Sequence, residues 1–189
     1  MFLRRIFASL TLTLMLAAGS AQAQQLSDHQ LIQSLGKVKA AAPAIDIALL
    51  IDEANANVGK GVAGLPNWSQ LTHLPQFAVA IDFENNSIAI EPESYRTIGL
   101  IADALHHPLL RQYKFLVVGH TSATGKPEHN LALSLKRADS ITTALATTFA
   151  VPANRLVAIG VGQELPLAST DPKAPVNRRV QLINLGLVE

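Results

Sequence analysis

The feature that most constrains this chain is a polar loop, bounded by glycines, that leads directly into a helical pattern. Residues 119–140 read GHTSATGKPEHNLALSLKRADS, and the apolar run at 115–120 precedes the loop. Such a run predicts a strand, and Pro127 suits the first turn of a helix. The helical spacing then recurs at Leu131, Leu135, Ala138, Thr142, Leu145 and Phe149. The sequence therefore predicts a strand, a polar loop and an amphipathic helix in succession.

A line of polar residues runs along the same predicted helix. Asn130, Ser134 and Arg137 are spaced i, i+4 and i+7, so they share one face beside the apolar stripe. The line begins near the loop and ends in a guanidinium, whose rigid fork suits a carboxylate. Two interpretations stay open: Arg137 binds an acidic ligand, or it pairs with a surface residue such as Asp139 or Glu128.

Three kinds of site do not fit the loop. It resembles a phosphate-binding loop but has five residues between its glycines instead of four, and Pro127 stands at the magnesium-binding position. His120 and Ser122 lack a nucleophile-elbow motif, and no third member of a triad can be named. The adjacent pair His106-His107 lacks the i, i+4 spacing of a helical metal site. We therefore expect no enzyme, no metal and no cofactor.

Around this centre the pattern alternates between strands and helices. The expected strands are 77–83, 115–120, 155–162 and 176–185, and the expected helices begin at Glu91-Pro92-Glu93 and at Pro127. The first helix has an apolar stripe of Ile98, Ile101, Ala102 and Leu105. This order predicts an α+β fold, a two-layer β/α/β/α/β-β sandwich with a mixed sheet and the helices on one face.

Composition supports a packed domain and excludes some chemistry. Apolar residues make up 49% of the chain and charged residues 15%, which suits a buried core. The absence of cysteine excludes disulfides and thiolate sites. The net charge is +1, and without Arg4 and Arg5 it is near −1, with 13 basic against 14 acidic residues. We therefore expect no nucleic-acid partner, because such partners require a basic face.

The first 23 residues have the pattern of a secretory signal peptide. Arg4-Arg5 form a charged start, Ile6 to Ala18 is an apolar run, and Ala21-Gln22-Ala23 is a small-x-small cleavage site. An uncleaved membrane anchor is disfavoured because the run is shorter than the ~20 residues that span a bilayer. We expect export, which in a bacterium with two membranes means the periplasm.

The segment that follows is an N-terminal extension whose structure the pattern leaves open. Ser27 caps a short helical stretch that stops at Gly36. The run Ile45–Ile51 fits either a strand or a helix, since periodicity cannot separate them over so short a length. The expected division is a signal peptide at 1–23, an extension or linker at 24–75 and a domain at 76–189.

The motifs resemble those of a known family. Residues 119–140 are similar to the signature G-H-T-D-x-x-G-x-x-x-x-N-x-x-L-S-x-x-R-A of the OmpA-like peptidoglycan-binding domain. The resemblance extends to IDFENNSIAIEPES before the loop and to RLVAIGVGQELPLAS and NRRV after it, and so covers about 76–186. It implies a β/α sandwich that binds the stem peptide of the cell wall non-covalently, chiefly through its diaminopimelate residue.

The resemblance also implies roles for single residues. Arg137 matches the arginine that grips the carboxylate of diaminopimelate, and Asn130 matches the asparagine that lines the same pocket. The remaining matches are Thr121, Thr124 and Gly125 in the ligand loop and Asn177, Arg178 and Arg179 in the final motif.

Ser122 departs from the family pattern. The family has an aspartate at this position, which is implied to pair with the ammonium group of the ligand. Hydrogen bonds to charged groups contribute about 1.5–3 kcal/mol, against roughly 1 kcal/mol for neutral pairs. Ser122 should therefore weaken binding about 5- to 30-fold. Glu128, just downstream, is a candidate for supplying the missing charge.

Two functions follow from these observations. The first is a periplasmic protein, associated with the outer membrane or the cell wall, that binds peptidoglycan. The second is an OmpA-like fold repurposed for protein contacts in the envelope, with the Ala- and Pro-rich segment 37–75 as the arm that binds a partner.

Overall fold

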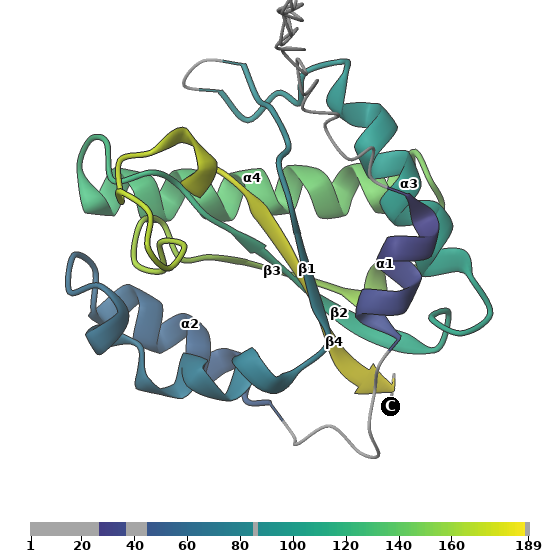
Figure 1. Cartoon of the computed structure of the whole chain (residues 1–189), viewed down its shortest axis with the longest axis horizontal. Coiled ribbons are helices and arrows are strands. Elements are labelled where there is room, and N and C mark those ends of the chain that lie inside the picture. Colours follow the sequence, from purple (N-terminus) through teal and green to yellow (C-terminus); the bar gives the residue numbers. More distant parts are fainter. Residues whose placement is uncertain (1–26, 37–44, 85–86, 188–189) are drawn as a thin grey trace, which may run out of the picture.

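A four-stranded mixed sheet lies at the centre of the fold (Figure 1). The computed structural model describes residues 27–36, 45–84 and 87–187, and the expected signal peptide lies outside them. The strands are β1 (Gln76–Val79), β2 (Tyr113–Gly119), β3 (Leu156–Gly160) and β4 (Val180–Leu187), in the order β1-β4-β2-β3. β2 and β3 are parallel, whereas β4 is antiparallel to β1 and to β2. The α+β class and the mixed sheet are therefore confirmed.

Three strands are shorter than the pattern predicted, and β3, expected over 155–162, spans only Leu156–Gly160. β4 begins only at Val180, because the preceding residues Pro175–Asn177 form a short 3-10 helix, η4, that opens with proline. β1 ends at Val79, whose partner Val180 is that first residue of β4, so the chain beyond Val79 has no strand to pair with. The segment that continues β1 instead makes an isolated bridge between Phe83 and Ile90.

Three helices cover one face of the sheet. They are α1 (Asp28–Leu35), α3 (Ser94–His106) and α4 (Pro127–Thr147). Ser27 caps α1 through a capping box with Gln30, as expected for the start of this helix. The core on this face contains Ile98, Ile101, Ala102 and Leu105 of α3, Ala138, Ile141 and Leu145 of α4, and Phe115 and Val117 of β2. Both helices predicted within 76–189 therefore lie on the same face.

Close contact between α4 and the sheet fixes the position of the helix. A Cβ atom on Gly119 would lie 2.1 Å from Ser134 O, and one on Gly160 would lie 2.3 Å from Leu135 N. Only glycine permits this approach of backbones. The contact also explains why Leu135, which was expected in the apolar stripe, is 42% exposed: its backbone, not its side chain, faces the sheet.

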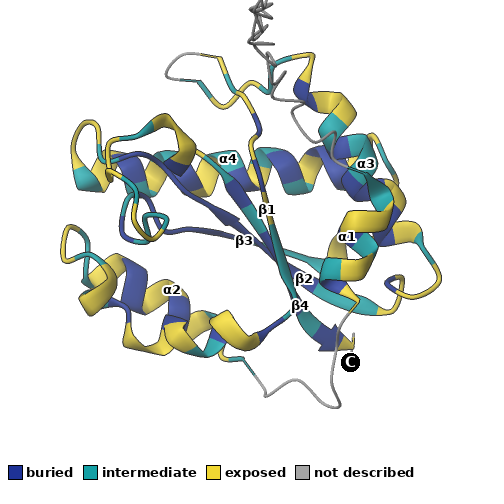
Figure 2. Ribbon diagram, viewed as in Figure 1, coloured by how far each residue is buried: buried dark blue, intermediate teal, exposed yellow. Residues whose placement is uncertain are grey.

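The opposite face of the sheet carries a layer built from the N-terminal extension. The run at 45–51 proves helical: α2 (Ile47–Ala56) is capped by Asp46, and the 3-10 helix η2 (Pro66–His73) follows it. Buried residues of this layer pack on the sheet side chains Leu116, Val118, Ile159, Val161 and Ile183. The layer is a third one, added to the two predicted. Figure 2 shows buried residues on the sides of α2 and α4 that are turned inward.

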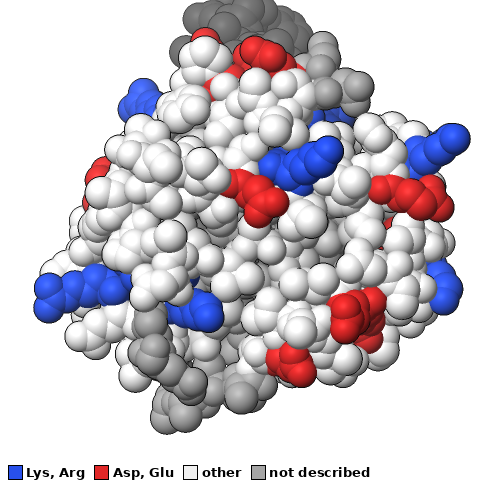
Figure 3. Space-filling model, turned by 180° about the vertical axis from the view of Figure 1, so that it is seen from behind, with Lys and Arg blue, Asp and Glu red and all other residues white. Residues whose placement is uncertain are grey.

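The surface carries charges of both signs. On the face seen from behind, Lys and Arg side chains are interspersed with Asp and Glu on a mainly uncharged surface (Figure 3). Within 27–36, 45–84 and 87–187, no helix has both the length and the apolar character needed to cross a membrane.

Candidate ligand-binding cleft

A cleft of about 770 Å³ opens where the loop after β2 meets α4 and the segment that continues β1. This volume lies within the range of small-molecule sites. The cleft brings together six of the residues predicted to bind ligand: Thr121, Ser122, Thr124, Asn130, Arg137 and Arg178. The other lining residues are Ile81, Asp82, Phe83, Glu91, Glu93, His129 and Leu133. Gly125 and Asn177, which were also predicted, are not among the described residues that line it.

Arg137 is held on one wall of the cleft by two contacts. Its guanidinium lies over the ring of Phe83, 4.7 Å from the centroid, and its Nε donates a hydrogen bond to Ser87 O at 3.2 Å. Burial lowers the pKa of Arg137 from its usual value, and the positive charge of Arg178 lowers it further. The side chain still carries its charge at neutral pH. Its hydrogen bond to a described residue goes to a carbonyl, rather than to Asp139 or Glu128.

Asn130 organises the ligand loop. Its Nδ2 donates to Ser122 O at 3.3 Å, to Thr124 O at 3.1 Å and to Gln163 Oε1 at 2.7 Å. The donors of this buried amide are therefore used within the protein, and the Oδ1 atom is the part that can serve a ligand. Ser134, the next residue of the polar line, is buried and accepts a hydrogen bond from Gly162 N at 2.8 Å. Two of the three residues in that line thus shape the site, and Arg137 faces into it.

Neutral hydroxyl groups form the floor of the cleft. Ser122 is 2% exposed, and its Oγ lies 3.0 Å from Thr124 Oγ1. Thr121 is 6% exposed, and its Oγ1 has no hydrogen-bond partner among the described residues. Gly125 adopts a positive φ of 96°, which allows the turn that closes the loop. Ser122, where the resemblance implies an aspartate, therefore offers an uncharged hydroxyl paired with that of Thr124.

Asn177 acts on the loop that precedes β4. Its side chain is fully buried, accepts a hydrogen bond from Leu167 N at 2.8 Å and donates to Asp171 O at 2.8 Å. These bonds hold residues 167–177 together and position the next residue, Arg178, at the cleft. Arg179 donates from Nη2 to Leu165 O at 3.0 Å.

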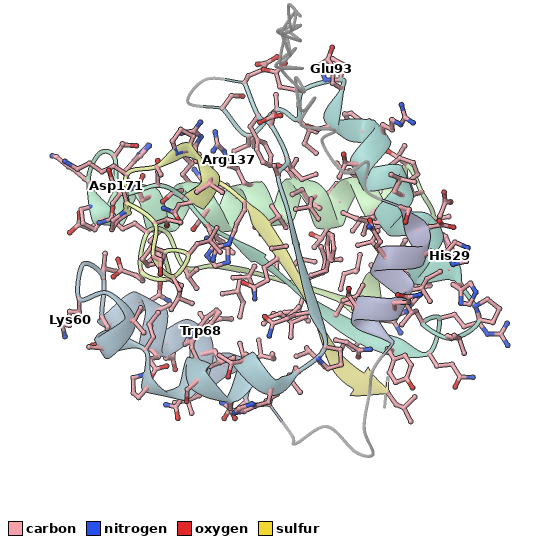
Figure 4. The ribbon with its side chains drawn as sticks, in the orientation of Figure 1. His29, Lys60, Trp68, Glu93, Arg137 and Asp171 are labelled. Atoms are coloured by element: carbon pink, nitrogen blue, oxygen red, sulfur yellow. The ribbon has the colours of Figure 1, made fainter. Side chains whose placement is uncertain are left out.

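The cleft also contains three carboxylates that sequence reasoning missed. Asp82, Glu91 and Glu93 line it, whereas Glu128, the expected source of negative charge, is not among its described lining residues. Figure 4 labels Arg137 on α4 and Glu93 near the start of α3, on either side of the segment that continues β1 in this view. The sequence pattern places Glu91 and Glu93 only at the start of a helix, and Asp82 only within a strand.

His120 at the base of the loop makes stability depend on pH. Burial lowers the pKa of His120 from 6.5 to about 3, and the charge of Arg179 contributes in the same direction. Its Nε2 lies 3.1 Å from Gln181 Oε1. Because the unfolded chain takes up this proton near pH 6.5 and the folded chain only near pH 3, protonation between these values favours unfolding.

We therefore expect the free energy of unfolding to fall as the pH is lowered from 6.5 toward 3, by up to about 1.4 kcal/mol per pH unit from this group. Urea unfolding at pH 7.5 and pH 5 measures the change. His120→Gln, which cannot titrate, should show a smaller loss between the two pH values. An equal loss in both proteins would contradict this role for His120.

Comparison with known proteins agrees with the fold and the motif. A family model described as the OmpA family matches residues 82–179, slightly more than half of the chain. Outer membrane porin F of Pseudomonas aeruginosa is 30% identical over 131 residues, which are 67% of this chain and 35% of the porin. The peptidoglycan-associated lipoprotein of Brucella melitensis is 34% identical over 91 residues, which are 48% of this chain and 52% of the lipoprotein.

Solved structures give the same fold. The OmpA-like domain of FopA1 from Francisella tularensis superposes with a TM-score of 0.50 at 17% identity, covering 60% of this chain and 75% of that one. The chain spans between 35% and 65% of the length of the first curated relatives that it matches. The extent of the family match, together with the mixed sheet and its helices, identifies the chain as a member of the OmpA family.

Proposed function

We propose that this protein is exported to the periplasm and binds peptidoglycan non-covalently, through the diaminopimelate residue of the stem peptide. The observation that carries the proposal is the cleft, in which Arg137 and Asn130 of α4 meet the loop hydroxyls and Arg178. The name of the Brucella relative, a peptidoglycan-associated lipoprotein, supports peptidoglycan as the ligand. The protein acts in this proposal as a binding module rather than as an enzyme.

Arg137 is suited to receive the carboxylate of the ligand. Its contact with Phe83 and its hydrogen bond to Ser87 O orient the guanidinium before any ligand arrives. A guanidinium held in this way loses less conformational freedom when it binds a carboxylate. Arg178 lines the same cleft and lowers the pKa of Arg137 through its own charge, so the two cations are close enough to repel each other. A bound carboxylate would relieve that repulsion.

The proposal is tested by sedimentation of the purified protein with peptidoglycan. We expect the protein to sediment with sacculi that contain diaminopimelate, and free diaminopimelate to release it in proportion to its concentration. Sacculi in which lysine replaces diaminopimelate provide the control, because they lack the second carboxylate and should retain less protein. Equal retention on both kinds of sacculi, or no retention on either, would contradict the proposal.

A second candidate is a protein-binding module, and the third layer favours it. Leu49 and Ile51 of α2 and Val62 beside η2 are exposed apolar side chains on the surface of this layer. Co-purification of a stoichiometric envelope protein, lost on substitution of Leu49 and Val62 by serine and accompanied by no retention on sacculi, would support this function in place of the first.

A further inference from the structure

Two of the carboxylates in the cleft face each other across a short antiparallel pairing. Phe83 and Ile90 form a bridge, and Glu91 N donates to Asp82 O at 3.0 Å. In this register Asp82 lies directly opposite Glu91, on the same side of the ladder. Residues in that relation have Cβ atoms about 4.5–5.5 Å apart. Both acidic side chains therefore start from neighbouring backbone positions at the edge of the cleft.

The hydrogen bonds of Asp82 in the described structure use its backbone and leave its carboxylate to the cleft. Its N–H donates to Ser94 Oγ at 2.9 Å, and its carbonyl accepts from Glu91. Asp82 is exposed and Glu91 is half-buried. The hydrogen bond to Ser94, the first residue of α3, thus fixes the backbone of Asp82 while both acidic residues line the cleft.

A buried hydroxyl gives independent evidence that the cleft takes a ligand. Thr121 lines the cleft and is 6% exposed, and its buried Oγ1 has no hydrogen-bond partner among the described residues. A buried hydroxyl without a partner costs about 1–3 kcal/mol, so the arrangement indicates that a polar group from outside the chain completes it. Arg137 and Arg178 also line this cleft. The cleft is therefore lined by two arginines and by the acidic residues Asp82 and Glu91. Such a lining fits a ligand that carries both a carboxylate and an ammonium.

We propose that Asp82 and Glu91 together bind the ammonium group of the ligand and so supply the negative charge that Ser122 does not. This inference rests on the proposed function, in which Arg137 receives the ligand carboxylate, and it adds the residues that select for an amine. An ammonium placed between the two carboxylates would gain two charged hydrogen bonds. In this proposal the negative charge comes from Asp82 and Glu91 on the wall opposite the ligand loop, instead of from residue 122 within the loop. Glu128 does not contact the ligand.

The experiment compares two ligands that differ only in their amino groups. Diaminopimelate and pimelate are titrated into the purified protein and into the double variant Asp82→Asn/Glu91→Gln, and affinities are taken from NMR chemical-shift changes. We expect the double variant to bind diaminopimelate about 10-fold or more weakly, since a charged partner is lost. Pimelate, which has no ammonium, should bind the variant as well as or better than the wild type. Glu128→Gln is the matched control and should change neither affinity.

The possible results separate this inference from the proposed function. Unchanged binding of diaminopimelate by the double variant, or equal weakening of both ligands, would overturn the role of the acidic pair. If Arg137→Ala still abolished binding in that case, the proposed function would stand. Misfolding is excluded when the melting temperature of the double variant equals or exceeds that of the wild type. Ser122→Asp in the double variant should restore affinity for diaminopimelate but not for pimelate.

Discussion

Arg137→Ala is expected to release the protein from peptidoglycan, with a loss of affinity of about 30-fold or more. Truncating one partner of a hydrogen-bonded charge pair costs about 2–5 kcal/mol, and the half-exposed position of Arg137 favours the lower part of that range. The measurement is sedimentation with sacculi over a series of peptidoglycan concentrations.

Arg137→Lys is the matched variant for this experiment. Lysine keeps the positive charge but lacks the planar fork, so its affinity should fall between those of the wild type and the alanine variant. The contact with Phe83 contributes roughly 0.5–1 kcal/mol to stability, and the melting temperature of the alanine variant should therefore change little. Unchanged retention of a folded Arg137→Ala variant would show that the cleft is not the peptidoglycan site.

Trp68→Ala is expected to destabilise the whole fold by about 3–5 kcal/mol, the usual cost of removing a buried tryptophan. Trp68 lies in η2, is buried against the sheet and donates from Nε1 to Leu50 O at 3.3 Å (Figure 4). Urea unfolding followed by circular dichroism measures the effect. Val62→Ala, in the same layer but at a residue that is 60% exposed, should change stability by less than about 0.5 kcal/mol.

Trp68 also tests whether the N-terminal extension belongs to the same folding unit as the sheet. Trp68 is the only tryptophan of the chain, so its fluorescence reports on the third layer, while circular dichroism reports on all helices and strands. We propose that residues 45–74 and the sheet unfold together, and the two transitions should then coincide. A fluorescence transition at lower urea, with the main transition unaffected by Trp68→Ala, would show instead that the extension is a separate unit.

Hydrogen bonds link the third layer to the ligand loop, so unfolding of residues 45–74 should also affect the cleft. Glu164 is buried and accepts hydrogen bonds from Gly59 N at 2.9 Å and Gly61 N at 2.6 Å. The preceding residue, Gln163, accepts the hydrogen bond from Asn130 that helps to hold the ligand loop. The N-terminal layer thus supports, through two adjacent side chains, the loop that forms the floor of the cleft.

The parts of the fold that could be predicted from the sequence are those with a local signal. The strand, loop and helix at 113–147 have clear periodicity, a proline at the helix start and glycines where the helix meets the sheet. Arg137 stood out because its spacing put it on the polar face of that helix. The family resemblance then implied which of these polar residues would face a ligand.

The remaining features depend on contacts that periodicity does not encode. The run at 45–51 is too short to distinguish a helix from a strand, and its helical state follows from the cap at Asp46 and from burial against the sheet. Asp82 and Glu91 lie opposite each other because an isolated β-bridge pairs Phe83 with Ile90 outside the named strands. The sequence does not predict this bridge, so it does not place the two residues at one site. Asn177 matches the family motif, but only its hydrogen bonds show that it acts through the loop before β4.

A crystal structure of the protein with diaminopimelate tests the central claim most directly. The account predicts that the ligand occupies the cleft, with a carboxylate against Arg137 and an ammonium between Asp82 and Glu91. A saturating concentration of diaminopimelate that leaves the cleft empty, or a ligand bound elsewhere on the surface, would contradict it.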